Sequence, residues 1–94
     1  MKGPNSHKWA ERDDVVAFCF AMYGSSPLGR DLNEVSSFLG IETGAMKMRI
    51  SNYHWLMNGK GLSNVCNQER KVFVEYKYAN LEACKDMLSE ILGE

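Results

Sequence analysis

The chain has little of what marks several specialised classes of protein. Its 94 residues include three cysteines and two prolines, and its net charge at pH 7 is only −1. No apolar run approaches the roughly 18 residues that a membrane-spanning helix needs, and the N-terminus lacks the apolar segment of a signal peptide. The near-neutral charge also excludes a polybasic protein that binds nucleic acid over its whole surface. We therefore expect a small, soluble, cytoplasmic domain that does not contact a membrane.

The cysteines, Cys19, Cys66 and Cys84, are few and far apart in the sequence. No CxxC pair is present, and neither His7 nor His54 is near a cysteine. A structural zinc site normally takes paired ligands at short spacing, and a disulfide scaffold needs more cysteines than these. We expect three reduced thiols, with Cys19 and Cys84 as small buried residues, and neither a metal nor a cofactor.

What is present is enough apolar sequence for one core. The chain is 45% hydrophobic and 24% charged, which excludes disorder, and its length fits one domain but is short for an enzyme with a deep pocket. We predict an all-α fold, a small helical bundle of about five helices that contains a helix-turn-helix. A mobile leader at residues 1–8 is expected before a single domain at 9–94. That domain divides into a helix-turn-helix core at about 9–58 and a C-terminal helical pair at about 65–93.

The first predicted helix spans about residues 10–23. Its first turn contains Glu11, Asp13 and Asp14. Carboxylates at this position complement the helix dipole, so we attribute these acids to dipole and solubility effects rather than to a metal site. Residues 25–30 are predicted to be a loop from their composition.

The next two helices form the predicted helix-turn-helix. The second helix follows Asp31, which forms a capping-box-like pair with Glu34, and it ends at Gly40. The third runs over about residues 44–57 with Thr43 as its N-cap. Two short helices joined by a turn that contains glycine match this pattern, although plain helical bundles contain it too.

Residues 67–78 fit either a helix or a strand. The sequence VFVEYKY at 72–78 alternates in the manner of a strand and is rich in β-branched and aromatic residues. A lone strand would leave its backbone groups unpaired, so we favour a helix with Asn67 as its N-cap. A last amphipathic helix follows the cap residue Asn80 and is expected to pack antiparallel to this one around the core.

Helical spacing also predicts the buried positions. With Met46 on the core side of the third helix, Ile50 and Tyr53 follow on the same side at offsets of four and seven. The residues that we expect to be largely buried are Trp9, Phe20, Leu39, Met46, Ile50, Tyr53 and Leu88.

Basic residues are concentrated in the middle of the chain. Residues 43–80 contain six basic and two acidic side chains, which gives a local net charge of +4. The segments 1–42 and 81–94 have net charges of −2 and −3. The positive segment begins with the third helix, where a helix that enters a DNA groove would need it, because phosphate attraction is electrostatic and local.

The third helix has the residue types of a DNA recognition helix. It offers a polar stripe, two further polar residues on another flank, and no acid from residue 43 to residue 68. We predict that it contacts double-stranded DNA, with phosphate contacts from two lysines outside it. The predicted base and groove contacts are Lys47, Arg49, Ser51, Asn52 and His54, and the phosphate contacts are Lys60 and Lys71.

Three side chains of this region have competing explanations. Asn52 is the strongest candidate for a bidentate bond to adenine. The competing explanation is that its amide bonds a neighbouring backbone group and fixes the loop after the helix. Trp55 fits either packing against a later helix or a contact surface. His54 has no nucleophile or acid at catalytic spacing, so a catalytic role is not expected.

Several motifs together carry a family resemblance. They are the opening Trp9 with Asp13 and Asp14, the corner of Leu39, Gly40 and Thr43, the helix residues Met48, Arg49, Ile50, Asn52 and Tyr53, and the loop Gly61, Leu62, Ser63 and Asn64. Over residues 8–78 the chain resembles the helical, Myb-like DNA-binding domain that precedes HNH endonuclease modules. The resemblance implies a trihelical DNA-binding core and a helix at 67–78.

The chain also departs from that family. Ala10 stands where the family has an N-capping threonine, Ile41 replaces a basic residue at the corner, and no HNH histidines follow. The resemblance therefore implies DNA binding without nuclease activity, and we do not expect an enzyme. The alternative is a small all-α protein–protein interaction module of phage or mobile-element type, for which six methionines and Trp55 would supply an adaptable apolar surface.

Overall fold

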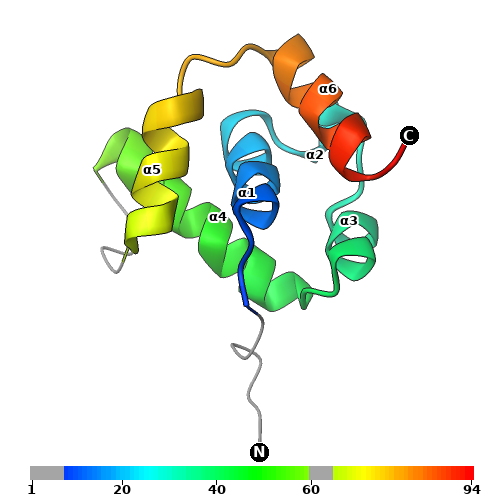
Figure 1. The fold of residues 1–94 in the computed structure, drawn as a ribbon, viewed down its shortest axis with the longest axis horizontal. Coiled ribbons are helices and arrows are strands. Elements are labelled where there is room, and N and C mark those ends of the chain that lie inside the picture. The colour runs from blue at the N-terminus through cyan, green and yellow to red at the C-terminus, as the bar shows by residue number, and fades with distance from the viewer. Residues whose placement is uncertain (1–7, 60–64) are drawn as a thin grey trace, which may run out of the picture.

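The computed structural model describes residues 8–59 and 65–94, and every regular element in these ranges is a helix (Figure 1). The all-α fold that the sequence predicts is thus confirmed, with six helices in place of about five. The predicted leader lies almost entirely outside the described residues, as does the loop at 61–64. The helices are α1 (Glu11–Tyr23), α2 (Ser25–Leu28), α3 (Leu32–Leu39), α4 (Thr43–Asn58), α5 (Asn67–Tyr76) and α6 (Leu81–Ile91).

Helix α1 is the centre of the molecule, and the other helices are arranged around it (Figure 1). It is buried continuously from Asp13 to Ala21. Phe18 meets Tyr53 of α4 edge to face at 5.8 Å between ring centroids, and it meets Phe73 of α5 in the same manner at 6.3 Å. One central aromatic residue therefore holds both α4 and α5 against α1.

Most of the predicted core is buried. Phe20, Leu39, Met46, Tyr53 and Leu88 are all buried, as expected from their spacing. Trp9 and Ile50, which were expected in the same core, are only half-buried and pack against its edge.

The short helix α2 corrects the prediction of a loop at residues 25–30. Leu28 is buried, so this segment contributes to the core. Gly29 then adopts a left-handed conformation with φ of 69°, and its N–H donates to the carbonyl of Ser26. Pro27 is compatible with the helix because the amides of a first turn have no partner within the helix in any case.

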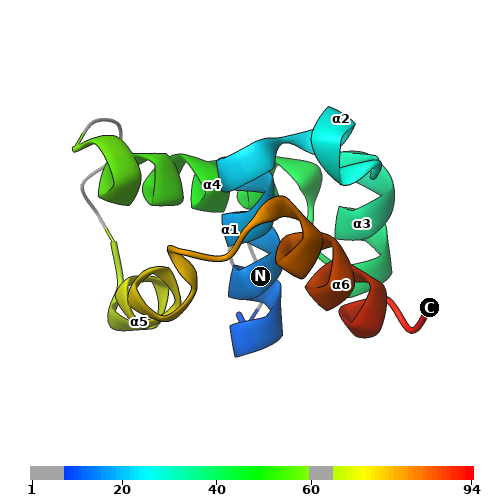
Figure 2. The same cartoon turned by 90° about the horizontal axis from the view of Figure 1, so that it is seen from above.

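Helices α5 and α6 do not form the antiparallel pair that the sequence predicts. They lie on either side of the N-terminal half of α1, and each packs against α1 (Figure 2). Phe73 anchors α5 to α1, whereas α6 packs on α1 and α2 through its buried residues Cys84 and Leu88. The hydroxyl of Tyr23 donates to the carbonyl of Ala79 at 2.8 Å, which ties the connection between α5 and α6 to the end of α1.

The helix starts follow the predicted caps in two places and differ in two others. The carboxylate of Asp31 accepts the Glu34 N–H at 3.0 Å. Asn80 accepts the Ala83 N–H at 2.8 Å. Asn67, however, is the first residue of α5 and not its cap. The cap residue is Cys66, whose N–H donates to the side chain of Glu69 at 2.9 Å. Thr43 is likewise the first residue of α4, and its N-cap is Glu42.

The two asparagines give a matched test of these helix starts. Asn80→Ala removes a side-chain cap and is expected to lower the free energy of unfolding by about 1 kcal/mol. Asn67→Ala removes no cap bond and should change it by less than about 0.5 kcal/mol. Urea denaturation followed by circular dichroism measures both values. Equal losses for the two variants would contradict this assignment of the caps.

Among the described residues, no helix has both the length and the apolar character needed to cross a lipid bilayer.

Candidate nucleic-acid interface

Helices α3 and α4 pack against each other and are joined by a turn of three residues, 40–42. Gly40 ends α3 in a left-handed conformation with φ of 74°, which glycine adopts without strain. Ile41 is buried, and the Thr43 hydroxyl donates to the Asn33 side chain at 2.9 Å across the turn. These contacts fix the direction in which α4 leaves α3.

Helix α4 buries one side and exposes the other. Met46 and Tyr53 are buried against the core, whereas Lys47, Met48 and His54 are exposed. The helix contains no acidic residue over its 16 positions. Its outward side therefore has both polar and apolar side chains, and none of them is an acid that would repel a phosphate.

The structure turns Arg49 inward, so the prediction that it projects outward is wrong. Its guanidinium lies 4.4 Å from the ring centre of Trp9 and forms two hydrogen bonds to the carboxylate of Asp14, from Nε at 2.7 Å and from Nη2 at 2.9 Å. Nε also lies 3.5 Å from the Glu69 carboxylate, and only 16% of the side chain is exposed. Burial lowers the pKa of Arg49, but the bonds to Asp14 and the charge of Glu69 outweigh it, and the pKa is raised above its ordinary value.

Asn52 also faces inward and contacts α5. Its Nδ2 donates to the Glu69 carboxylate at 2.9 Å. Its Oδ1 is buried and has no hydrogen-bond partner among the described residues. The predicted outward position is therefore wrong. The side chain has a structural bond, as the competing explanation expected, but the acceptor is a carboxylate on α5 and not a backbone group near the following loop.

The carboxylate of Asp14 is the centre of this polar cluster. It is fully buried and accepts hydrogen bonds from the Tyr53 hydroxyl at 3.0 Å and from the Gln68 amide, in addition to those from Arg49. The attribution of Asp14 to solubility is therefore wrong, although the residue does lie in the first turn of α1. Burial and the Asp14 charge raise the pKa of Tyr53 above its ordinary value, which keeps the phenol as a donor.

We name this group the Asp14 cluster. It joins α1, α4 and α5 through six side chains, which are Asp14, Arg49, Asn52, Tyr53, Gln68 and Glu69. Sequence analysis missed it because its hydrogen bonds join residues 17 to 54 positions apart. The cluster holds α4 in place and leaves its opposite side free.

The other predicted DNA-contact residues that the structure describes lie outside the Asp14 cluster, on α4 and α5. Lys47 is exposed, and no ion pair joins it to any residue in the described ranges. His54 is exposed, with Nε2 3.0 Å from the carbonyl oxygen of Ala21 at the end of α1, and Ser51 is half-buried. On α5, Nζ of the exposed Lys71 lies 3.6 Å from the carboxylate of Glu11. Lys60 lies outside the described residues.

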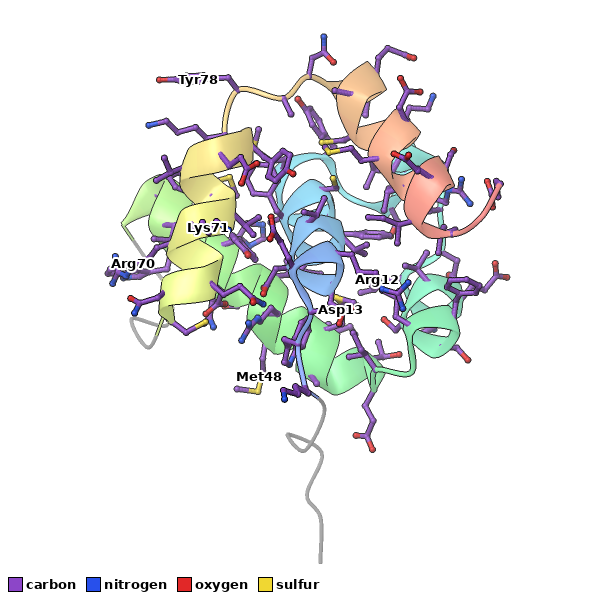
Figure 3. The ribbon with its side chains drawn as sticks, in the orientation of Figure 1. Arg12, Asp13, Met48, Arg70, Lys71 and Tyr78 are labelled. Carbon is purple, nitrogen blue, oxygen red and sulfur yellow. The ribbon has the colours of Figure 1, made fainter. Side chains whose placement is uncertain are left out.

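A further cation, Arg70, lies beside this surface, and sequence analysis did not select it. Its guanidinium lies 5.8 Å from the ring centre of Trp55, so Trp55 does meet a later helix. The Arg70 side chain points away from the body of the molecule beside α5 (Figure 3). Arg70 belongs to the basic segment at 43–80, and that local charge is the sequence signal that points to it. We define the α4 face as Lys47, Ser51, His54 and Trp55 of α4 together with Arg70 of α5.

The described residues contain no group of histidine, cysteine, aspartate or glutamate side chains that could hold a metal ion. Comparison with protein-family models, with curated protein sequences and with solved structures finds no match to this chain.

Proposed function

We propose that this chain binds double-stranded DNA through the α4 face. The observation that carries the proposal is the arrangement of α3, a three-residue turn and α4, in which α4 has no acidic residue and exposes Lys47 on its outward side. In helix-turn-helix proteins the second helix lies in the major groove and the first crosses the backbone. A helix of 16 residues is about 24 Å long, with a diameter close to the groove width of about 12 Å.

Arg49 and Asn52 belong to the Asp14 cluster, so this proposal gives them a supporting role in place of the DNA contacts that the sequence predicts. Their hydrogen bonds to Asp14 and Glu69 support the orientation of α4 against α1 and α5. Direct contact with DNA is assigned to Lys47 and Ser51, with His54 at the edge toward α1. Arg70 joins Lys71 and Lys60 as a phosphate contact, because basic residues in elements that flank the recognition helix set its register on the backbone.

A salt series with single lysine and arginine variants tests this proposal. Duplex affinity should fall steeply with salt, and Lys47→Ala or Arg70→Ala should each flatten the dependence of log K on log salt by about one unit. Fluorescence anisotropy of a labelled duplex measures the affinity. Lys85→Ala on α6 is the matched control, because it removes the same charge from an exposed position on another helix.

The proposal would fail if wild type bound no duplex at low salt. It would also fail if the double variant Lys47→Ala/Arg70→Ala bound as well as the Lys85→Ala control.

A second candidate function is protein–protein interaction without DNA binding. It rests on large apolar side chains that the fold leaves exposed, since Phe38 is 59% and Tyr78 is 89% exposed. Met48 and Val74 are also exposed, and Met48 lies on α4 itself. Met48 and Tyr78 point away from the body of the molecule (Figure 3). Binding through such contacts would respond only weakly to salt, so the same salt series distinguishes the two functions.

A further inference from the structure

Residues of α1, α5 and α6 line a groove on the surface of the molecule. Figure 2 shows α5 and α6 on either side of the N-terminal half of α1, with α4 on the other side of α1 from α6. The volume of the groove is about 280 Å³. Apolar parts of all three helices line it, from Val15 of α1, Tyr76 of α5, and Met87 and Ile91 of α6. Small-molecule pockets typically have about 300–1,000 Å³ and enclose most of their ligand. This groove is smaller and open, so it suits one or two apolar side chains of a protein partner.

One edge of the groove is acidic. Glu90 lines it, and Asp86 and Glu82 precede Glu90 at intervals of four residues, so the three carboxylates share one side of α6. All three are exposed, and none has an ion-pair partner within 4 Å in the described ranges. This row of carboxylates therefore has uncompensated negative charge beside an apolar floor.

The remaining charges around the groove are already partnered. On its α5 side, the carboxylate of Glu11 lies 3.6 Å from the ammonium of Lys71. The guanidinium of Arg12, which also lines the groove, lies 3.8 Å from the carboxylate of Asp13. A docking partner would thus meet free charge mainly at the α6 edge, and that charge is negative.

We infer that this groove docks a basic amphipathic helix of a partner protein. The apolar side chains of that helix occupy the floor formed by Val15, Met87 and Ile91, and a row of lysine or arginine residues faces Asp86 and Glu90. Carboxylates four residues apart lie about 6 Å apart along α6, which matches cations four residues apart on an opposing helix. The acidic edge repels phosphates, so nucleic acid is not the occupant.

Residues of α1, α5 and α6 line the groove and none of α4 does. In Figure 2, α4 lies across the other side of α1 from α6. A partner helix in the groove leaves the outward side of α4 uncovered. The inference therefore does not depend on DNA binding.

The probe is a fluorescein-labelled synthetic peptide of roughly 18 residues, a length at which isolated helices form. It has leucines on one side of the helix and lysines on the flanks, and a matched peptide has glutamate at every lysine. Anisotropy titration of the folded chain should show binding of the lysine peptide and none of the glutamate peptide. The double variant Asp86→Lys/Glu90→Lys should weaken binding of the lysine peptide by about tenfold.

Two further measurements separate docking from general charge attraction. The control variant Glu34→Lys/Glu42→Lys makes the same change of net charge at exposed positions on α3 and before α4, and it should bind the lysine peptide nearly as wild type does. Met87→Ser removes an apolar contact without a change of charge and should also weaken binding by about tenfold. Circular dichroism establishes that each variant is folded.

Amide chemical shifts give the location of the bound peptide. Residues 15, 87 and 91 should show the largest changes on addition of the lysine peptide. The inference is overturned if the lysine peptide does not bind, if the glutamate peptide binds equally, or if the two charge-reversal variants lose affinity to the same extent. Shift changes centred on α4 would overturn it as well.

Discussion

Replacing Asp14 with alanine is expected to lower the free energy of unfolding by about 3–5 kcal/mol, as is typical when one partner of a buried ion pair is removed. Without this carboxylate, the Arg49 guanidinium loses two hydrogen bonds, and the carboxylate that remains beside it, that of Glu69, is more distant, 3.5 Å from its Nε. The Tyr53 hydroxyl, which is buried, loses its acceptor. In the unfolded chain, water forms hydrogen bonds with these polar groups. A group that is buried without a partner in the folded state lacks those bonds, and this desolvation cost lowers the free energy of unfolding. Urea denaturation followed by circular dichroism measures the loss.

A neighbouring acid provides the control for Asp14. Glu11 lies in the same first turn but is exposed, and the one ion pair that it forms within the described ranges is the 3.6 Å contact with Lys71. Glu11→Ala should therefore change the free energy of unfolding by less than about 0.5 kcal/mol. In a double-mutant cycle with Arg49→Met, the combined loss should be smaller than the sum of the single losses by at least about 1 kcal/mol. Additive losses, or equal losses for Asp14 and Glu11, would contradict the ion-pair account.

The parts of the fold that the sequence predicts correctly depend on local interactions. The Asp31 and Asn80 caps act within three residues, and the glycine at position 40 ends α3 by its own conformation. Apolar spacing within one helix similarly identifies Met46 and Tyr53 as buried. The mutual packing of α5 and α6 was predicted wrongly because each has an apolar stripe that fits any apolar partner. Both helices pack against α1, and the apolar stripe of a helix does not indicate which other helix it packs against.

The candidate site shows the same limit. Helical periodicity places Arg49 and Asn52 correctly on a flank of α4 that differs from the Lys47 side. Periodicity does not indicate that α5 covers this flank and brings Glu69 within 2.9 Å of the Asn52 amide. Glu69 and Asp14 both occupy the first turn of a helix, where carboxylates are common for reasons of the helix dipole. Their burial became evident only when the three helices were placed together.

Replacing Phe18 with alanine is expected to lower the free energy of unfolding by about 3–5 kcal/mol. Phe18 is fully buried near the middle of α1 and is in edge-to-face contact with Tyr53 and Phe73. The substitution removes apolar burial and both aromatic contacts, and it leaves a cavity where three helices meet, at a point that backbone movement of one helix alone does not close. Urea denaturation again measures the change, and the near-ultraviolet circular dichroism of the aromatic residues should weaken in parallel.

Phe38 is the matched control, because the same substitution there removes the same atoms from a side chain that is 59% exposed. Phe38→Ala should lower the free energy of unfolding by less than about 1 kcal/mol, since little apolar area leaves the interior and no enclosed cavity forms. The difference between the two variants therefore measures burial rather than the chemistry of the ring. If both variants unfolded at the same urea concentration, α1 would not be the helix around which this core is built.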